Sequence, residues 1–247
     1  MLKKIINILL SSLLLVYLIF SVAFINPKVD QDKECRNIQI KIVETTGASY
    51  LTVPQIETLL EKANIQLKGQ RMSKIHIGDI EKALKENKWI KNVEVYKTID
   101  GTVKMQVHQR TPILRVISEK RNYYIDTEGQ IMPVPLYFAT YVPVATGTIS
   151  DEYATKQLCD FARFLHKNEN ESWSKEIEQI HVLPNLDVEL TPRKGDHIIV
   201  LGKIENHKEN LDKLALFYEK GLNVVGWNKY SRINLKYKNQ VVCTKKE

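Results

Sequence analysis

A predicted β-hairpin between residues 89 and 116 constrains the fold of this chain more than any other stretch. Apolar and polar residues alternate from residue 103 to residue 108, which places the apolar side chains on one face of a strand. The pair Asp100-Gly101 separates this strand from a preceding run of β-formers, and Asp-Gly favours a tight hairpin turn because such turns require positive φ. A helical pattern ends just before Trp89, so we expect a helix to pack on the apolar face of the hairpin.

Composition and charge narrow the class of protein. The 247 residues give room for one large domain or two small ones, and 43% hydrophobic with 26% charged residues is typical of a folded chain. The formal net charge is +7, but the cations are scattered, and no aromatic-basic motif or zinc-binding spacing accompanies them. We therefore expect no nucleic-acid partner, and the charge is better suited to anionic lipid head groups or to an acidic protein partner.

Residues 5–25 form a continuous apolar run without a charged side chain. At about 1.5 Å per residue, a helix of this length reaches roughly 30 Å, the thickness of a bilayer core. Lysines precede the run, so the positive-inside rule predicts a cytoplasmic stub at 1–4, followed by a single transmembrane helix at 5–25 and a polar linker at 26–36. The predicted membrane-anchor residues are Ile5, Leu10, Leu15, Phe20 and Ile25. Small residues at 21–23 keep a cleaved signal peptide open as the alternative.

The next segment predicts a small domain that mixes strands and helices. Residues 37–43 alternate isoleucine with polar residues, so we expect a strand with one buried face. Thr52 followed by Gln55 resembles a helix capping box, and Asp79 is placed to cap a second helix. With the hairpin, the predicted order over residues 37–110 is strand, helix, helix, strand, strand.

Residues 111–244 predict a second, mixed α/β domain with a largely antiparallel sheet, followed by a tail at 245–247. Short apolar or alternating runs bounded by turn residues predict strands at 113–116, 123–126, 130–132, 177–182, 186–190 and 197–201. Amphipathic patterns predict two helices, at 151–166 and 206–220. The second should begin at Asn206 and end at Gly221, because glycine is favoured just after the last helical turn. The predicted fold class is therefore α+β.

The last strands supply the predicted partner-binding edge. Residues 231–237 alternate apolar Ile233, Leu235 and Tyr237 with basic or hydrogen-bonding residues, so we expect a strand with one buried side. A C-terminal strand often lies at the edge of a sheet, where free N–H and C=O groups are open to a partner strand. The candidate partner-binding residues are Arg232, Asn234, Lys236, Tyr237, Gln240 and Val242.

The sequence contains no recognisable catalytic constellation. It lacks a G-x-S-x-G elbow, an H-E-x-x-H zinc motif and a Walker loop. Residues 126–129 predict a turn rather than a metal loop, because the further acidic ligands that such a loop needs are missing. Cys35, Cys159 and Cys243 form no CxxC pair, and their odd number does not suit a disulfide framework. We therefore expect no enzymatic activity, no cofactor, no metal site and no small-molecule substrate.

Several motifs follow one another in a fixed order. Residues 87–116 (NKWIKNVEVYKTIDGTVKMQVHQRTPILRV) contain a tryptophan-hydrophobic pair, a V-x-V strand and a Q-x-x-P exit. The motifs after them are Tyr123-Tyr124-Ile125-Asp126, Gly129, Met132-Pro133, Val142-Pro143 and Gly147. This ordered set resembles the FtsQ/DivIB family of cell-division proteins. Gln109 stands where many relatives carry glutamate, and Lys236-Tyr237 stands where the family has an Arg-Tyr pair.

The resemblance implies a single N-terminal transmembrane helix in the cell inner membrane, a β-α-α-β-β POTRA domain and a second "β domain", the last two in the periplasm. It implies binding of the small coiled-coil division proteins FtsB and FtsL, enrichment at the division septum and a role that links early and late division proteins. The edge argument adds a mechanism: the partner adds a strand to the final strand of the chain, and basic side chains there meet acidic partner residues.

Two other classes stay open at this point. A POTRA-containing periplasmic arm of an outer-membrane assembly or secretion protein would need a barrel of many strands of about ten residues. The chain after residue 116 instead predicts two helices and only short strands. An anchored periplasmic hydrolase would need a catalytic site, which the motifs do not supply.

Overall fold

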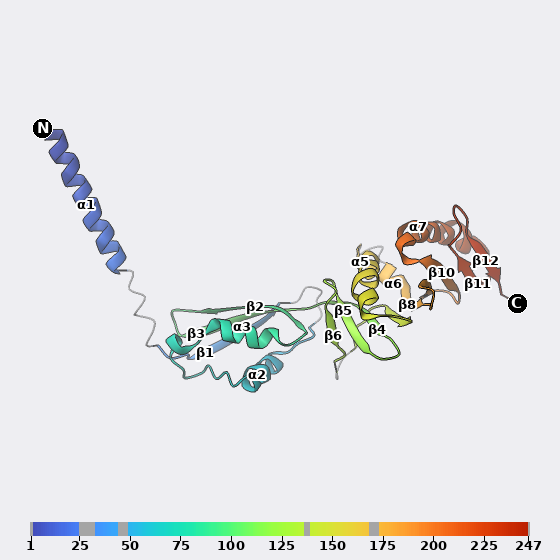
Figure 1. The fold of residues 1–247 in the computed structure, drawn as a ribbon, viewed down its shortest axis with the longest axis horizontal. Coiled ribbons are helices and arrows are strands. Elements are labelled where there is room, and N and C mark those ends of the chain that lie inside the picture. Colours follow the sequence, from blue (N-terminus) through green and yellow to red (C-terminus); the bar gives the residue numbers. More distant parts are fainter. Residues whose placement is uncertain (1, 25–32, 44–48, 136–138, 168–172, 247) are drawn as a thin grey trace. The chain divides into compact units, whose positions relative to one another are not determined.

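The computed structural model describes residues 2–24, 33–43, 49–135, 139–167 and 173–246, which form two compact units (Figure 1). Unit 1 comprises Met1–Glu44 and Leu51–Gln109, and unit 2 comprises Thr45–Tyr50 and Arg110–Glu247. Each unit has its own set of buried apolar side chains, so each can be understood from its own packing.

The N-terminal helix α1 (Leu2–Phe24) corrects the prediction of a transmembrane helix at residues 5–25. Among the residues that the structure describes, no helix is both long enough and apolar enough to cross a membrane. The predicted anchor residues Ile5, Leu10, Leu15 and Phe20 lie on α1, whereas Ile25 lies outside the described residues.

Unit 1 combines a three-stranded sheet with two helices. Its elements are β1 (Asn37–Val43), α2 (Val53–Lys62), η2 (Met72–Lys74), α3 (Ile77–Lys85), β2 (Ile90–Lys97) and β3 (Thr102–Gln109). The strand order is β1-β3-β2, with β1 parallel and β2 antiparallel to β3. The helices contribute Ile56, Ile80 and Leu84 to the core, each at most 1% exposed.

The hairpin of β2 and β3 forms as its sequence predicts. Val93 lies opposite Val107 in the ladder, and both side chains are buried. The turn contains Gly101 at φ 83°, and a Cβ atom there would lie 2.9 Å from the carbonyl oxygen of Glu34. Glycine is therefore needed twice, for a left-handed backbone conformation and for the close approach of a neighbouring segment.

The two helices of unit 1 begin differently. The predicted capping box of Thr52 and Gln55 is present at the start of α2, and in it the Thr52 N–H donates to Oε1 of Gln55 over 2.9 Å. The prediction that Asp79 caps the second helix is wrong, because α3 begins at Ile77 with His76 in the capping position. Asp79 lies in the first turn of α3, where a carboxylate is favourable near the positive end of the helix, and the buried side chains of this helix are Ile80 and Leu84.

Unit 2 is built on one long sheet. Its strands are β4 (Pro112–Ile117), β5 (Asn122–Asp126), β6 (Ile131–Pro133), β7 (Val144–Gly147), β8 (Ile177–Val182), β9 (Asp187–Pro192), β10 (Ile198–Lys203), β11 (Tyr230–Asn234) and β12 (Val242–Lys245). Its helical segments are α4 (Asp151–Tyr153), η3 (Ala154–Leu158), α5 (Cys159–Leu165), α6 (Trp173–Glu176), η4 (Ile204–Asn206), α7 (His207–Phe217), η5 (Tyr218–Leu222) and α8 (Asn223–Val225).

The nine strands follow the order β12-β11-β10-β9-β8-β7-β4-β5-β6. The pairs β4–β7, β7–β8 and β10–β11 are parallel, and the other neighbouring strands are antiparallel. Helices α5 and α7 share one face of this sheet, since the ring of His207 lies 5.3 Å from that of Phe161 and 4.5 Å from that of Phe164. The core of unit 2 lies between these helices and the sheet.

The last helix corrects the prediction that Gly221 ends it. Helical residues continue from α7 through η5 and α8 to Val225, and Gly226 follows at φ 97°. Gly221 lies inside this run, where an added Cβ would stand 2.9 Å from the ring of Phe217. The glycine therefore makes room for an aromatic ring, and the left-handed conformation that ends the helix falls on Gly226.

Burial of His197 makes the stability of unit 2 depend on pH. The residue is 3% exposed, and its Nε2 lies 2.9 Å from the Tyr218 hydroxyl. Burial lowers the pKa of His197 and that of His166, so the folded state favours their neutral forms. The resulting stabilisation is complete above the ordinary histidine pKa of about 6.5 and is lost as the pH falls through the lowered folded values. We expect the melting temperature to fall between pH 7 and pH 5, and to fall less in His197→Gln; equal losses in both proteins would contradict this account.

Candidate protein-binding edge

The two edges of the unit 2 sheet differ in how open they are. The edge strand β6 has only 3 residues and ends at Pro133, which has no N–H to offer. The other edge strand, β12, contains no proline. Within the described residues, β12 therefore presents the more accessible row of backbone donors and acceptors.

The backbone of β12 shows which of its groups face outward. The Lys246 N–H, just after the strand, donates to the carbonyl of Lys229 over 3.1 Å, so it points toward β11. Backbone groups alternate in direction along a strand, and the N–H of Thr244 therefore also points toward β11. The N–H and C=O of Cys243 then point away from the sheet, where a partner strand can reach them.

The predicted strand at residues 231–237 is shorter than expected and does not lie at the edge. β11 ends at Asn234 and lies between β10 and β12, so the backbone of Arg232 and Asn234 is already flanked by strands. The strand is shorter because of a contact with α7: Lys213 Nζ donates to the carbonyl of Leu235 over 2.7 Å and to that of Tyr237 over 2.9 Å. These two carbonyls accept hydrogen bonds from a side chain and not from a neighbouring strand.

Tyr237 was expected on the buried side of this strand, and that prediction is wrong. Ile233 and Leu235 are fully buried, whereas Tyr237 is 49% exposed. The difference follows from the end of β11, because the period of two no longer applies after Asn234. Gln240 and Val242, the remaining candidates, lie at the turn before β12 and at the first residue of β12.

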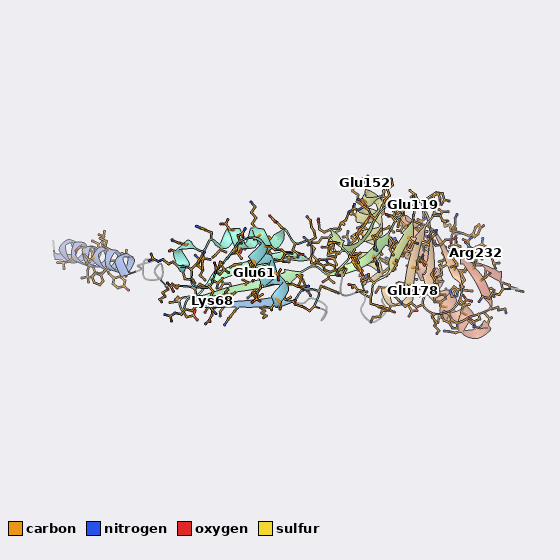
Figure 2. The ribbon with its side chains drawn as sticks, turned by 90° about the horizontal axis from the view of Figure 1, so that it is seen from below. Glu61, Lys68, Glu119, Glu152, Glu178 and Arg232 are labelled. Carbon is orange, nitrogen blue, oxygen red and sulfur yellow. The ribbon has the colours of Figure 1, made fainter. Side chains whose placement is uncertain are left out.

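Two of the predicted basic contacts are engaged within unit 2. Arg232, which Figure 2 labels beside the last strands of the chain, forms an ion pair with Glu189. Lys236 Nζ lies 2.7 Å from Oδ2 of Asp187, and this pair lowers the pKa of Asp187 and raises that of Lys236. Both cations are thus already paired with carboxylates, and a partner would have to compete for them.

Other lysines near β12 remain available. Residues 220–246 contain seven lysines and arginines and no aspartate or glutamate. Three of the seven, Arg232, Lys236 and Lys246, form ion pairs. In the described part of the chain no ion pair involves the other four, which are Lys220, Lys229, Lys238 and Lys245. The surroundings of β12 are therefore positive and suit an acidic partner segment.

An apolar groove lies beside the turn before β12. It has a volume of about 770 Å³ and is lined by one side of α7 and η5 together with residues 239–241. Leu216 is 52% exposed in this groove, and Phe217 and Val241 also line it. Val242, the next residue of the chain, is 45% exposed. Exposed apolar side chains are thus concentrated next to the open edge, as at many protein-binding surfaces.

The cysteines do not form a reactive centre in the described structure. Cys35 and Cys159 are buried and Cys243 is half-buried, and burial raises the pKa of all three thiols. A raised pKa keeps a thiol protonated and weakly nucleophilic. Among the described residues no cluster of three or more histidine, cysteine, aspartate or glutamate side chains is placed to hold a metal ion.

An open strand, unpaired lysines around it and an apolar groove beside it together define a site suited to binding a protein segment. Residues 111–244 match the family model described as FtsQ/DivIB, C-terminal related, and residues 33–108 match the model of a POTRA-like domain. The chain belongs to the FtsQ/DivIB family, which confirms the resemblance. It is similar to Cell division protein FtsQ of Geotalea daltonii, with 24% identity over 209 residues that cover 79% of this chain and 74% of that protein.

Family membership supports a role in cell division. The family is of the scaffold type and is not known for enzymatic activity, and it suggests other proteins of the division machinery as partners. The similarity to FtsQ also suggests a protein of the division septum.

Proposed function

We propose that this protein is a scaffold of the bacterial division machinery and that it binds FtsB- and FtsL-like coiled-coil proteins by β-strand addition at β12. The observation that carries the proposal is the open edge of β12, with the backbone of Cys243 directed away from the sheet. Such a scaffold would link early and late division proteins at the septum. The site lies one strand further along the chain than the segment that the sequence pattern favoured.

The electrostatics of the edge indicate the chemistry of the partner. Lys238 precedes β12 and Lys245 is its last residue, and neither forms an ion pair in the described structure, whereas Arg232 is paired with Glu189. A partner strand with carboxylates near its ends would therefore meet these lysines first. We assign the role first predicted for Arg232 and Lys236 to Lys238 and Lys245, because they can gain a partner without losing one.

Backbone hydrogen bonds to β12 alone are too weak for tight binding, so we expect apolar contacts at the groove to contribute as well. A backbone hydrogen bond contributes about 0.5–1.5 kcal/mol net, so a strand as short as β12 can gain only a few kcal/mol from it. A dissociation constant of about 1 μM corresponds to roughly 8 kcal/mol. Burial of apolar partner side chains against Leu216 and Val242 can supply much of the difference, since about 25 cal/mol is gained per Å² removed from water.

The test is co-purification of the full chain with the FtsB-like protein of the same organism. We expect Val242→Glu to weaken capture by about tenfold or more, because a buried, unpaired carboxylate costs more than one decade of affinity. Tyr237→Glu should also weaken capture, since its side chain is 49% exposed beside the edge. Ile117→Glu is the matched control, because Ile117 is 38% exposed at the end of β4 in the same unit.

The three variants separate the possible outcomes. Loss of capture in Val242→Glu and Tyr237→Glu, with normal capture by Ile117→Glu, supports binding at β12. Undiminished capture by folded Val242→Glu and Tyr237→Glu proteins would overturn strand addition at this edge. Equal loss in all three would assign the effect to added negative charge rather than to the edge.

A further inference from the structure

Three segments of unit 1 meet at the end of the sheet where the β2–β3 turn lies. The Cys35 N–H donates to the carbonyl of Gln70 over 2.7 Å, and the Arg36 N–H donates to that of Gly101 over 2.8 Å. Lys33 Nζ donates to the carbonyl of Ile99 over 2.8 Å. Residues 33–36, 68–74 and 97–101 are thereby joined into one surface, which we call the basic end.

The basic end carries an excess of positive charge. Its three segments contain six cations and two acidic residues, Glu34 and Asp100. The Asp100 carboxylate accepts hydrogen bonds from the hydroxyls of Thr98 and Thr102, which lower its pKa and satisfy its charge within the turn. In the part of the chain that the structure describes, no ion pair engages the four exposed cations of this surface, which are Arg36, Lys68, Arg71 and Lys74.

An apolar side chain projects from the same surface. Ile99 is 75% exposed, more than any other large apolar residue of unit 1 that the structure describes beyond α1. Its turn is held by hydrogen bonds, since the Gly101 N–H donates to the carbonyl of Thr98 over 3.2 Å and Lys33 donates to the carbonyl of Ile99 itself. A single exposed isoleucine is ordinary on a protein surface. One that is fixed at a turn, on a surface that also carries four unpaired cations, offers both charge and apolar contact to a partner that contains a charged layer and an apolar layer.

We propose that the basic end binds the surface of anionic phospholipids, with the four cations against lipid phosphates and Ile99 reaching the boundary of the acyl chains. Lipid head groups place negative charge above hydrocarbon, and this order matches a surface that carries both unpaired cations and an exposed apolar side chain. The contact is peripheral and uses only unit 1, so it is independent of strand addition at β12. An acidic protein segment would pair with the cations but would not bury the Ile99 side chain in an apolar environment.

The test measures, in the full chain, whether position 99 enters an apolar environment when vesicles are added. An environment-sensitive fluorophore is attached to Ile99→Cys in a protein that also carries Cys243→Ser, since Cys35 and Cys159 are buried. The probes are vesicles of phosphatidylcholine alone and vesicles with about one quarter phosphatidylglycerol. We expect a blue shift of the emission only with the anionic vesicles, and a weaker one at high salt because salt screens the attraction.

Charge-reversal variants of equal net charge identify the surface. Glutamate at positions 36, 68, 71 and 74 should weaken the apparent affinity at least about tenfold, because each cation near an anionic membrane contributes roughly fivefold. The control places glutamate at Lys82, Lys85, Lys88 and Lys91, toward the opposite end of the hairpin from Asp100. It should change the affinity by less than the first set does. The proposal would be overturned if the two sets had equal effects on the affinity. It would also be overturned by an emission shift with vesicles of pure phosphatidylcholine, or by no shift with either kind of vesicle.

Discussion

Replacement of Cys243 by proline is expected to lower capture of the division partner by about tenfold or more while unit 2 stays folded. The N–H of Cys243 points away from β11, so the substitution removes a donor that only a partner strand can use. The lost hydrogen bond accounts for about 1 kcal/mol, and the proline ring also keeps the partner backbone from approaching. The measurement is the dissociation constant of the full chain with the purified FtsB-like protein, together with the melting temperature.

Two matched variants isolate the cause. Cys243→Ala removes the same thiol and keeps the N–H, so it should bind nearly as well as the natural protein. Thr244→Pro removes an N–H that points into the sheet, so it should lower the melting temperature as well as binding. Normal capture by a folded Cys243→Pro protein would show that the edge of β12 is not used.

Gly147→Ala is expected to destabilise unit 2 by about 3 kcal/mol or more, one of the largest effects of any single methyl group in this chain. Gly147 has φ 99°, and a Cβ atom there would lie 2.1 Å from the carbonyl oxygen of Val182. That carbonyl also accepts a hydrogen bond from the Thr148 N–H over 2.9 Å, so it cannot simply move aside. β7 lies between β4 and β8, and the strain therefore falls in the middle of the sheet.

Thermal unfolding measures this effect, with Gly226→Ala as the control. Gly226 has a similar φ of 97° but no atom within 4 Å of an added Cβ, so it should show the cost of the dihedral alone, about 1–2 kcal/mol. At about 2–4 °C per kcal/mol, Gly147→Ala should lower the melting temperature by roughly 6–12 °C. Equal shifts in the two variants would contradict a clash with Val182.

Local features of unit 1 could be predicted from the sequence because residues that are neighbours in the chain determine them. Asp100-Gly101 specifies a tight turn, and the alternating residues that follow specify which face of β3 is buried. Asp79 was misassigned as the N-cap of α3 because several adjacent residues can fit the sequence preference for a helix start. The choice among them depends on which side chains the helix buries, and these are Ile80 and Leu84.

The candidate site was harder to predict because its contacts join distant parts of the chain. The ion pair of Arg232 with Glu189 spans 43 residues, and that of Lys236 with Asp187 spans 49. Lys213 ends β11 early by binding carbonyls 22 and 24 residues away. A periodic pattern contains no information on such partners, so it placed the edge one strand too early.

Tyr237 shows a different limit. It was treated as a core residue from its place in an alternation of apolar and polar residues that had already ended at Asn234.

Site-specific photocrosslinking in dividing cells tests the central claim most directly. A photoreactive amino acid is placed at Val242 or Lys245 on β12, and at Ile131 on the opposite edge strand β6 as the control. Adducts with an FtsB-like coiled-coil division protein from positions 242 and 245, and none from position 131, are the predicted result. Adducts with that protein from position 131, or none from β12 in cells that divide normally, would contradict binding at the β12 edge.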